Sequence, residues 1–280
     1  MELISADTTF DSSHQGEYVL AQGTSAVRRL LVLHRLYGPT GRRLLLKAGL
    51  ERGMHVADFG CGVGATTRMI AEMVGPSGTV TGIDSSPEQI DQAATTCGGA
   101  GLSNVSFRIA DACATGIPSH SFDVVYCRFL LLHLTNPSDG LREMGRVLKP
   151  GGILLVEDGD IGSAGSEPPT ILNAGAALFM RLGHARGLNY SLANSLYRLV
   201  KDTGFVDPQI EIHQPAGCQG DHGDLLVSSI AEAGPAFVAA GIITAPQLED
   251  LLQEMRAAVA DPNLLVLTPR MSVVWARNPA

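Results

Sequence analysis

The chain has 280 residues, a formal net charge of −8 and a pI near 5.4. This acidic balance disfavours a nucleic-acid substrate, because affinity for a polyanion comes largely from Lys and Arg side chains at the phosphates. The five cysteines are scattered, odd in number and without a C-x-x-C pair, which argues against a disulfide framework and against a cysteine zinc site.

The cysteine usage is typical of a reducing compartment, and we expect a cytoplasmic protein. Residues 1–7 lack a basic segment followed by an apolar core. No later segment approaches the roughly 18 uninterrupted apolar residues of a membrane-spanning helix. We therefore expect neither a signal peptide nor a membrane span, and no membrane partner.

Residues 1–49 are expected to form a polar arm and two helices that cover the ligand site. Apolar residues between 24 and 37 recur at helical spacing and place His34 on the apolar face. Gly38-Pro39 predicts a break in this helix. A second helix is expected from a Thr40 cap to residue 49.

Residues 50–161 alternate regularly between strand and helix patterns. Such alternation predicts parallel strands joined by right-handed crossovers, with helices on both faces of a doubly wound α/β sheet. The expected strands are 55–59, 79–84, 105–109, 122–127 and 153–157, and the expected helices are 65–74, 87–97 and 137–147.

Residues 162–280 are less regular and are expected to complete a seven-stranded, mostly parallel sheet. Two insertions, about 162–190 and 217–262, are expected to form a helical cap over the ends of the strands, where open α/β sheets bind ligands. The expected helices are 170–182, 192–203, 224–240 and 245–259, and the expected strands are 207–213 and 264–276.

The glycine-rich stretch after the first strand is the strongest sign of function. A short apolar run ends at Asp58, and Gly60, Gly62 and Gly64 follow. Glycines here allow a sharp turn with positive φ and a close approach of ligand to backbone. The same stretch also satisfies the dinucleotide fingerprint, which leaves an NAD site open. Asp58 favours a ligand with an amino-acid group over a dinucleotide, because an acid in the turn repels a pyrophosphate but attracts the ammonium of an amino acid.

The segment from about residue 54 to 157 closely resembles the class I S-adenosylmethionine-dependent methyltransferases. Five stretches carry this resemblance, in the family's order and spacing: Asp58-Phe59-Gly60-Cys61-Gly62-Val63-Gly64, Thr81-Gly82-Ile83-Asp84, Ala110-Asp111-Ala112, Phe122-Asp123-Val124-Val125-Tyr126-Cys127, and Val147-Leu148-Lys149-Pro150-Gly151-Gly152. The resemblance implies a Rossmann-like methyltransferase fold and S-adenosylmethionine as cofactor, with S-adenosylhomocysteine as its product.

Two acids have the clearest expected roles at this cofactor. Asp84 ends the second strand, where its carboxylate can accept hydrogen bonds from both ribose hydroxyls, or alternatively cap the following helix. By the resemblance, Asp111 contacts adenine, the alternative being an ordinary loop acid. The full set of expected cofactor residues is Tyr18, Asp58, Gly60, Cys61, Gly62, Asp84, Ser85, Asp111, Ala112, Cys127 and Arg128.

Catalysis is expected to depend mainly on proximity and alignment, because the sulfonium cofactor already carries a reactive methyl group. His133 is the candidate general base, since it follows the fourth strand at the cofactor end and histidine titrates near neutral pH. A structural histidine is the alternative. The candidate acceptor-pocket residues, for which packing or solvation is the alternative, are His34, Tyr37, Asp158, His184 and Tyr190.

The predicted function is methyl transfer to a small or medium organic metabolite, such as a natural product. An NAD-dependent oxidoreductase and an S-adenosylmethionine-binding protein without methyl transfer are the alternatives. No metal site is expected, because Asp221-His222-Gly223-Asp224 lacks a further set of ligands. A homodimer is compatible with this prediction.

Overall fold

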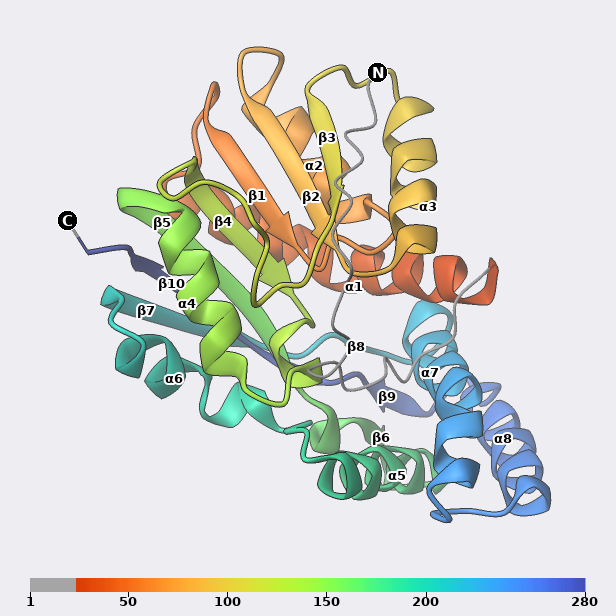
Figure 1. The fold of residues 1–280 in the computed structure, drawn as a ribbon. Coiled ribbons are helices and arrows are strands. Elements are labelled where there is room, and N and C mark those ends of the chain that lie inside the picture. The colour runs from red at the N-terminus through yellow and green to blue at the C-terminus, as the bar shows by residue number, and fades with distance from the viewer. Residues whose placement is uncertain (1–23, 280) are drawn as a thin grey trace.

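The computed structural model describes residues 24–279, and a seven-stranded sheet forms its centre (Figure 1). The strand order is β3-β2-β1-β4-β5-β10-β7, and β10 runs antiparallel to both of its neighbours. The doubly wound, mostly parallel sheet predicted from the sequence is therefore confirmed. Its strands are β1 (His55–Phe59), β2 (Thr79–Asp84), β3 (Val105–Ile109), β4 (Phe122–Arg128), β5 (Leu148–Asp160), β7 (Val206–His213) and β10 (Arg270–Arg277).

Helices cover both faces of this sheet. On one face, buried side chains of α1 (Thr24–Ala48) and α2 (Ala65–Val74) pack on β1, β2 and β4, and α3 (Pro87–Gly98) lies beside α2. On the other face, α4 (Pro137–Val147) and α6 (Leu196–Asp202) supply buried side chains to the larger core. The central strands are apolar on both faces because both are covered.

The cap consists of three helices and a small sheet at one end of the main sheet (Figure 1). Its helices are α5 (Ile171–Arg186), α7 (Asp221–Ala239) and α8 (Ala245–Val259). Its strands are β6 (Gly165–Glu167), β8 (Ala216–Gly217) and β9 (Leu265–Leu267), in the order β6-β9-β8. Among residues 24–279, the short 3-10 helix η2 (Leu131–His133) joins β4 to α4, whereas η3 (Ile161–Ser163) and η4 (Leu192–Asn194) lie where the chain passes between the main sheet and the cap.

The predicted break at Gly38-Pro39 is wrong, because α1 is one continuous helix of 25 residues. A proline inside a helix removes a hydrogen bond and costs about 3 kcal/mol. Pro39 is exposed, whereas Tyr37, Leu44 and Leu45 on either side of it are fully buried. Burial of such side chains stabilises the helix by about 1.5–3 kcal/mol each, and together they outweigh the cost of Pro39 inside the helix.

Two other expected elements are each divided into two. The last strand is divided, because Thr268 and Pro269 separate β9 from β10 and Thr268 bonds to the carbonyl oxygen of Pro215 through both its N–H and its hydroxyl. The helix expected at 192–203 is likewise divided into η4 and α6. Among residues 24–279, no helix is long and apolar enough to cross a membrane.

Candidate active site

A cavity of about 1050 Å³ lies between the glycine turn, the loops that follow the parallel strands, and the cap. Its wall combines the main sheet's loops with residues of α1, α5, α7 and α8. Pockets for drug-sized ligands span about 300–1,000 Å³, so this space suits a cofactor together with a second molecule.

The glycine turn adopts the positive φ values that its sequence predicts. Gly60, Gly62 and Gly64 have φ values of 67°, 51° and 77°, a region that side chains other than glycine rarely occupy. A Cβ atom at Gly64 would lie 2.9 Å from that of Ala93, so α2 and α3 approach closely here. Gly64 is also the N-cap of α2 and provides no side-chain cap, which leaves the positive end of the helix at the turn.

Asp84 fastens this turn to the end of β2. Its Oδ2 accepts a hydrogen bond from the Gly62 N–H at 2.9 Å, and its Oδ1 accepts one from the Ser86 N–H at 3.0 Å. Ser86 itself is the N-cap of α3. Burial raises the pKa of Asp84, and the backbone hydrogen bonds oppose this rise. The carboxylate thus orders the glycine turn and the residue before α3, whereas the helix cap considered for it from the sequence is provided by Ser86; Asp84 also faces the cavity.

Asp58 is the second acid at the turn and is only 1% exposed. Its Oδ2 accepts a hydrogen bond of 2.6 Å from the Thr67 hydroxyl in the first turn of α2. Burial raises the pKa of Asp58 to about 7, although the Thr67 hydroxyl and the Arg128 cation act in the opposite direction. A carboxyl with this pKa in a cavity wall is suited to receiving a cation.

Arg128, at the end of β4, lies beside the first turn of α2, which directly follows the glycine turn. Its Nη2 donates to the Thr66 hydroxyl at 2.7 Å and lies 3.2 Å from His34 Nδ1. Burial, Arg128 and Arg68 together lower the pKa of His34 to about 4, so His34 is neutral and able to accept from the guanidinium. The Arg128 side chain is therefore held between α1 and the N-terminus of α2.

The remaining predicted cofactor residues separate into three groups. Cys61, Ser85, Asp111 and Ala112 line the cavity, as do Gly60 and Gly62. Asp111 Oδ1 accepts a hydrogen bond from the Cys113 N–H at 2.8 Å, which orders the loop after β3. Cys127 does not line the cavity, because its side chain is fully buried within the larger core. Tyr18 lies outside the described residues.

Four of the five predicted acceptor-pocket residues do not line the cavity, namely His34, Tyr37, Asp158 and His184. The Tyr37 hydroxyl lies within hydrogen-bond distance of the Pro269 carbonyl oxygen, at 2.8 Å, and Tyr37 is fully buried. Asp158 is buried beneath η2 and accepts hydrogen bonds from the N–H groups of Leu132 and Gly159. His184 is exposed on α5.

Tyr190 and His133 do line the cavity and lie next to each other. Their rings meet edge to face with centroids 5.9 Å apart, and Phe179 contacts the Tyr190 ring in the same manner at 5.8 Å. Burial and the nearby Arg29 cation lower the pKa of His133 to about 3. His133 is therefore uncharged across the neutral pH range.

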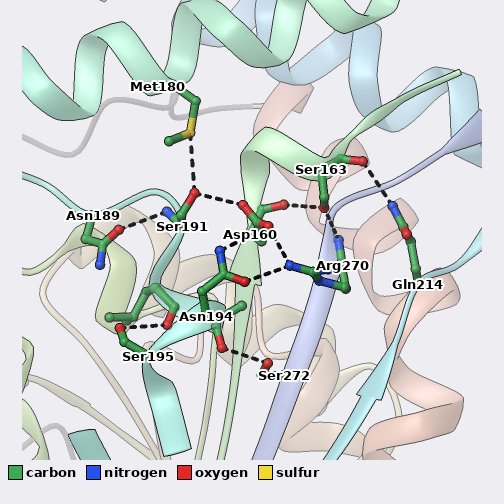
Figure 2. Close-up of polar contacts among 12 residues, drawn as sticks. Asp160, Ser163, Met180, Asn189, Ser191, Asn194, Ser195, Gln214, Arg270 and Ser272 are labelled. Atoms are coloured by element: carbon green, nitrogen blue, oxygen red, sulfur yellow. Dashed lines mark hydrogen bonds and ion pairs between the residues drawn. The ribbon is translucent and has the colours of Figure 1, made fainter. Parts of the chain in front are cut away.

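The loop that carries Tyr190 is fastened by a polar network that the sequence analysis did not anticipate (Figure 2). At its centre, Asp160 accepts hydrogen bonds from Ser191, Asn194 and Arg270, at 2.8, 3.2 and 2.8 Å. The Ile161 N–H also donates to the Tyr190 carbonyl oxygen at 2.8 Å. The sequence shows three acids at the end of β5. It does not show the network, because the residues that donate hydrogen bonds to the Asp160 carboxylate are 31 to 110 residues away.

Arg29 is a charged residue of the cavity wall that the sequence analysis missed. It lies on α1, is 3% exposed, and forms a 2.7 Å ion pair with Glu232 of α7. No local pattern marks Arg29, because Glu232 is 203 residues away.

Residues 56–152 match the model of the family described as "Methyltransferase domain". The matched residues contain β1 except for its first residue, β2 to β4, the glycine turn, Asp84 and Asp111, so the match covers the cofactor side of the cavity. This segment is a class I S-adenosylmethionine-dependent methyltransferase domain. S-adenosylmethionine is the methyl donor of that family.

Curated relatives agree with this assignment of the methyltransferase domain. The chain is 35% identical to aklanonic acid methyltransferase DauC of a Streptomyces species, over 51% of this chain and 64% of that protein. It is 39% identical to the ubiquinone/menaquinone biosynthesis C-methyltransferase UbiE of Hahella chejuensis, over 44% of this chain and 49% of the relative. The chain thus spans between about half and two thirds of the curated relatives it matches.

A solved structure extends the likeness of the fold beyond the methyltransferase domain. Phosphoethanolamine N-methyltransferase 2 of Haemonchus contortus, solved with S-adenosylhomocysteine, has a TM-score of 0.53 and 19% sequence identity. The comparison covers 91% of this chain and 53% of the other.

The chemistry of the cavity wall fits the family's cofactor. The turn offers uncapped N–H groups and an acid, and Asp84 and Asp111 add two carboxylates to the wall, which are acceptors of the kind that a diol and an amino-purine need. Within residues 24–279, no group of three or more His, Cys, Asp and Glu side chains is arranged to hold a metal ion.

Proposed function

We propose that this chain transfers a methyl group from S-adenosylmethionine to a small or medium organic metabolite, with a natural product as the acceptor. The observation that carries the proposal is that a single cavity extends from the methyltransferase glycine turn to the apolar cap. The acidic net charge and the names of the relatives, among them aklanonic acid methyltransferase, support a small-molecule acceptor.

We assign the cofactor's parts to residues by their chemistry. Asp84 would hold the ribose hydroxyls, Asp111 the adenine amino group, and Asp58 the ammonium of the amino-acid end. Arg128 would hold the carboxylate, because a guanidinium pairs well with carboxylates and Arg128 stands at the positive end of α2. When bound, the cofactor supplies a methyl group on a sulfonium centre.

The protein's own contribution is alignment and exclusion of water. Holding two reactants in place contributes on the order of 7–11 kcal/mol to lowering a barrier. We propose that alignment outweighs general-base catalysis by His133, because the depressed pKa of this residue makes it a weak base. Replacing His133 by Gln should therefore lower kcat by less than about tenfold, whereas a base contributes about 10²–10⁴-fold.

Calorimetry with S-adenosylmethionine and with NAD tests the cofactor, and S-adenosylhomocysteine accumulation in cell extract tests transfer. Tight binding of NAD with no binding of S-adenosylmethionine would contradict the proposal. Binding without accumulation of S-adenosylhomocysteine would favour a protein that retains the cofactor but lacks methyl transfer.

The wider organisation of the chain stays a prediction. We propose that residues 1–49 cover the cofactor, that 50–161 bind it, and that 162–280 complete the sheet and form the acceptor side. Tyr18 in the first segment is proposed to close over the cofactor. The cytoplasmic location and the homodimer also stay predictions.

A further inference from the structure

The cap side of the cavity is largely apolar. Helices α5, α7 and α8 contribute to it the side chains of Leu172, Phe179, Leu225, Leu226, Ile230 and Met255. An apolar wall orients a ligand poorly by itself, so a few polar groups normally fix its position.

Arg29 is a cation in this apolar surrounding. Its side chain is 3% exposed and that of its partner Glu232 is 4% exposed, with 2.7 Å between Nε and Oε2. Removing both charges from water is costly, and apolar residues of similar volume often replace such a pair without loss of stability. Stability alone therefore does not explain an arginine at this position.

The need to join α1 to α7 does not explain the buried Arg29–Glu232 pair either, since two exposed ion pairs already connect these helices. Arg35 donates to both carboxylate oxygens of Asp221, at 2.6 and 2.7 Å, and Arg28 lies 3.5 Å from Asp224. The buried pair differs from these two because Arg29 lies in the cavity wall.

We propose that Arg29 recognises an anionic oxygen, such as a carboxylate, phenolate or enolate, on an otherwise apolar acceptor. Guanidinium stays charged at all physiological pH values and suits carboxylate-like oxygens, and Arg29 brings this group into the cavity wall while its Nε donates to Glu232. Glu232 is a positioning residue that fixes the plane of the guanidinium. The neighbouring His133 is neutral, so the cation on this part of the wall is Arg29, next to the Glu232 carboxylate. This inference depends on the proposed function, because it assigns the acceptor of that same site.

The test uses two probes of equal ring size, the anion 2-naphthoate and the neutral 2-naphthylmethanol. Their affinities are measured by calorimetry on the full chain saturated with S-adenosylhomocysteine. Arg29→Met alone would leave the Glu232 charge buried and unpaired, so the informative variant is the apolar double replacement Arg29→Met with Glu232→Met. Arg28→Met, which removes an exposed pair, is the matched control.

The native chain and Arg28→Met should bind 2-naphthoate about 10- to 100-fold more tightly than the alcohol. The double replacement should lose this preference while its S-adenosylhomocysteine affinity and melting temperature are maintained. A preference retained in the double replacement, or absent from the native chain, would overturn the role of Arg29. Failure of the native chain to bind S-adenosylhomocysteine would instead overturn the proposed function, and the two results are read in separate titrations.

Discussion

Binding of the cofactor's amino-acid end should release protons from Asp58. In the free protein this carboxyl is 1% exposed and burial raises its pKa to about 7, so it is about half protonated at pH 7. An ammonium beside it favours the ionised form and should return the pKa to about 4. The expected release on binding S-adenosylhomocysteine is then about 0.9 proton at pH 6, about 0.5 at pH 7 and about 0.1 at pH 8.

Calorimetry in buffers of different ionisation enthalpy measures this release directly. Asp58→Asn keeps an oxygen that can accept from Thr67 but does not titrate, so it should abolish the release. Asp158→Asn is the matched control, because Asp158 has a pKa also raised to about 7 by burial but lies outside the cavity wall. An unchanged release in Asp58→Asn, or proton uptake by the native chain at pH 6, would refute the reasoning.

Three further predictions concern cofactor binding, the glycine turn and pH. Asp84→Ala should weaken S-adenosylhomocysteine binding by about 1–3 kcal/mol in calorimetry, because it removes the proposed ribose acceptor and two backbone hydrogen bonds, and an unchanged affinity would contradict the ribose assignment. Gly64→Ala should lower the free energy of unfolding in urea by about 1–3 kcal/mol, because the new Cβ meets Ala93 and φ is positive. The control Gly101→Ala, with φ of 70° but no atom within 4 Å of the new Cβ, should lower it by only about 1 kcal/mol. Equal losses would show that the contact with Ala93 does not contribute. The folded chain binds more protons at Asp158 than the unfolded chain does, so the stability from this group is present below about pH 4 and is lost as the pH rises to 7. Between pH 4 and pH 8, the free energy of unfolding of Asp158→Asn should therefore rise by about 4 kcal/mol relative to that of the native chain, as measured in denaturant titrations. A difference that stays constant over this pH range would contradict the raised pKa.

The sequence predicted elements well wherever a local pattern and the packing agree. The apolar strands and the amphipathic helices of residues 50–161 have patterns whose period matches their burial in the sheet. The prediction failed at Gly38-Pro39 because the sequence shows the destabilising effect of a proline, a few kcal/mol, but not the burial of Tyr37, Leu44 and Leu45 that offsets it. That burial depends on tertiary packing. It failed at Thr268 for a similar reason, since the hydrogen bonds that divide the last strand end on a distant residue.

For the site, the sequence by itself determined the glycine turn and the acids at the strand ends. These residues act through backbone conformation and through positions at the ends of parallel strands, both of which follow from local spacing. Only the tertiary structure decided which side chains reach the cavity, because that depends on contacts between distant segments. It turned His34 toward Arg128, buried Asp158 beneath η2, and paired Arg29 with Glu232 across 203 residues.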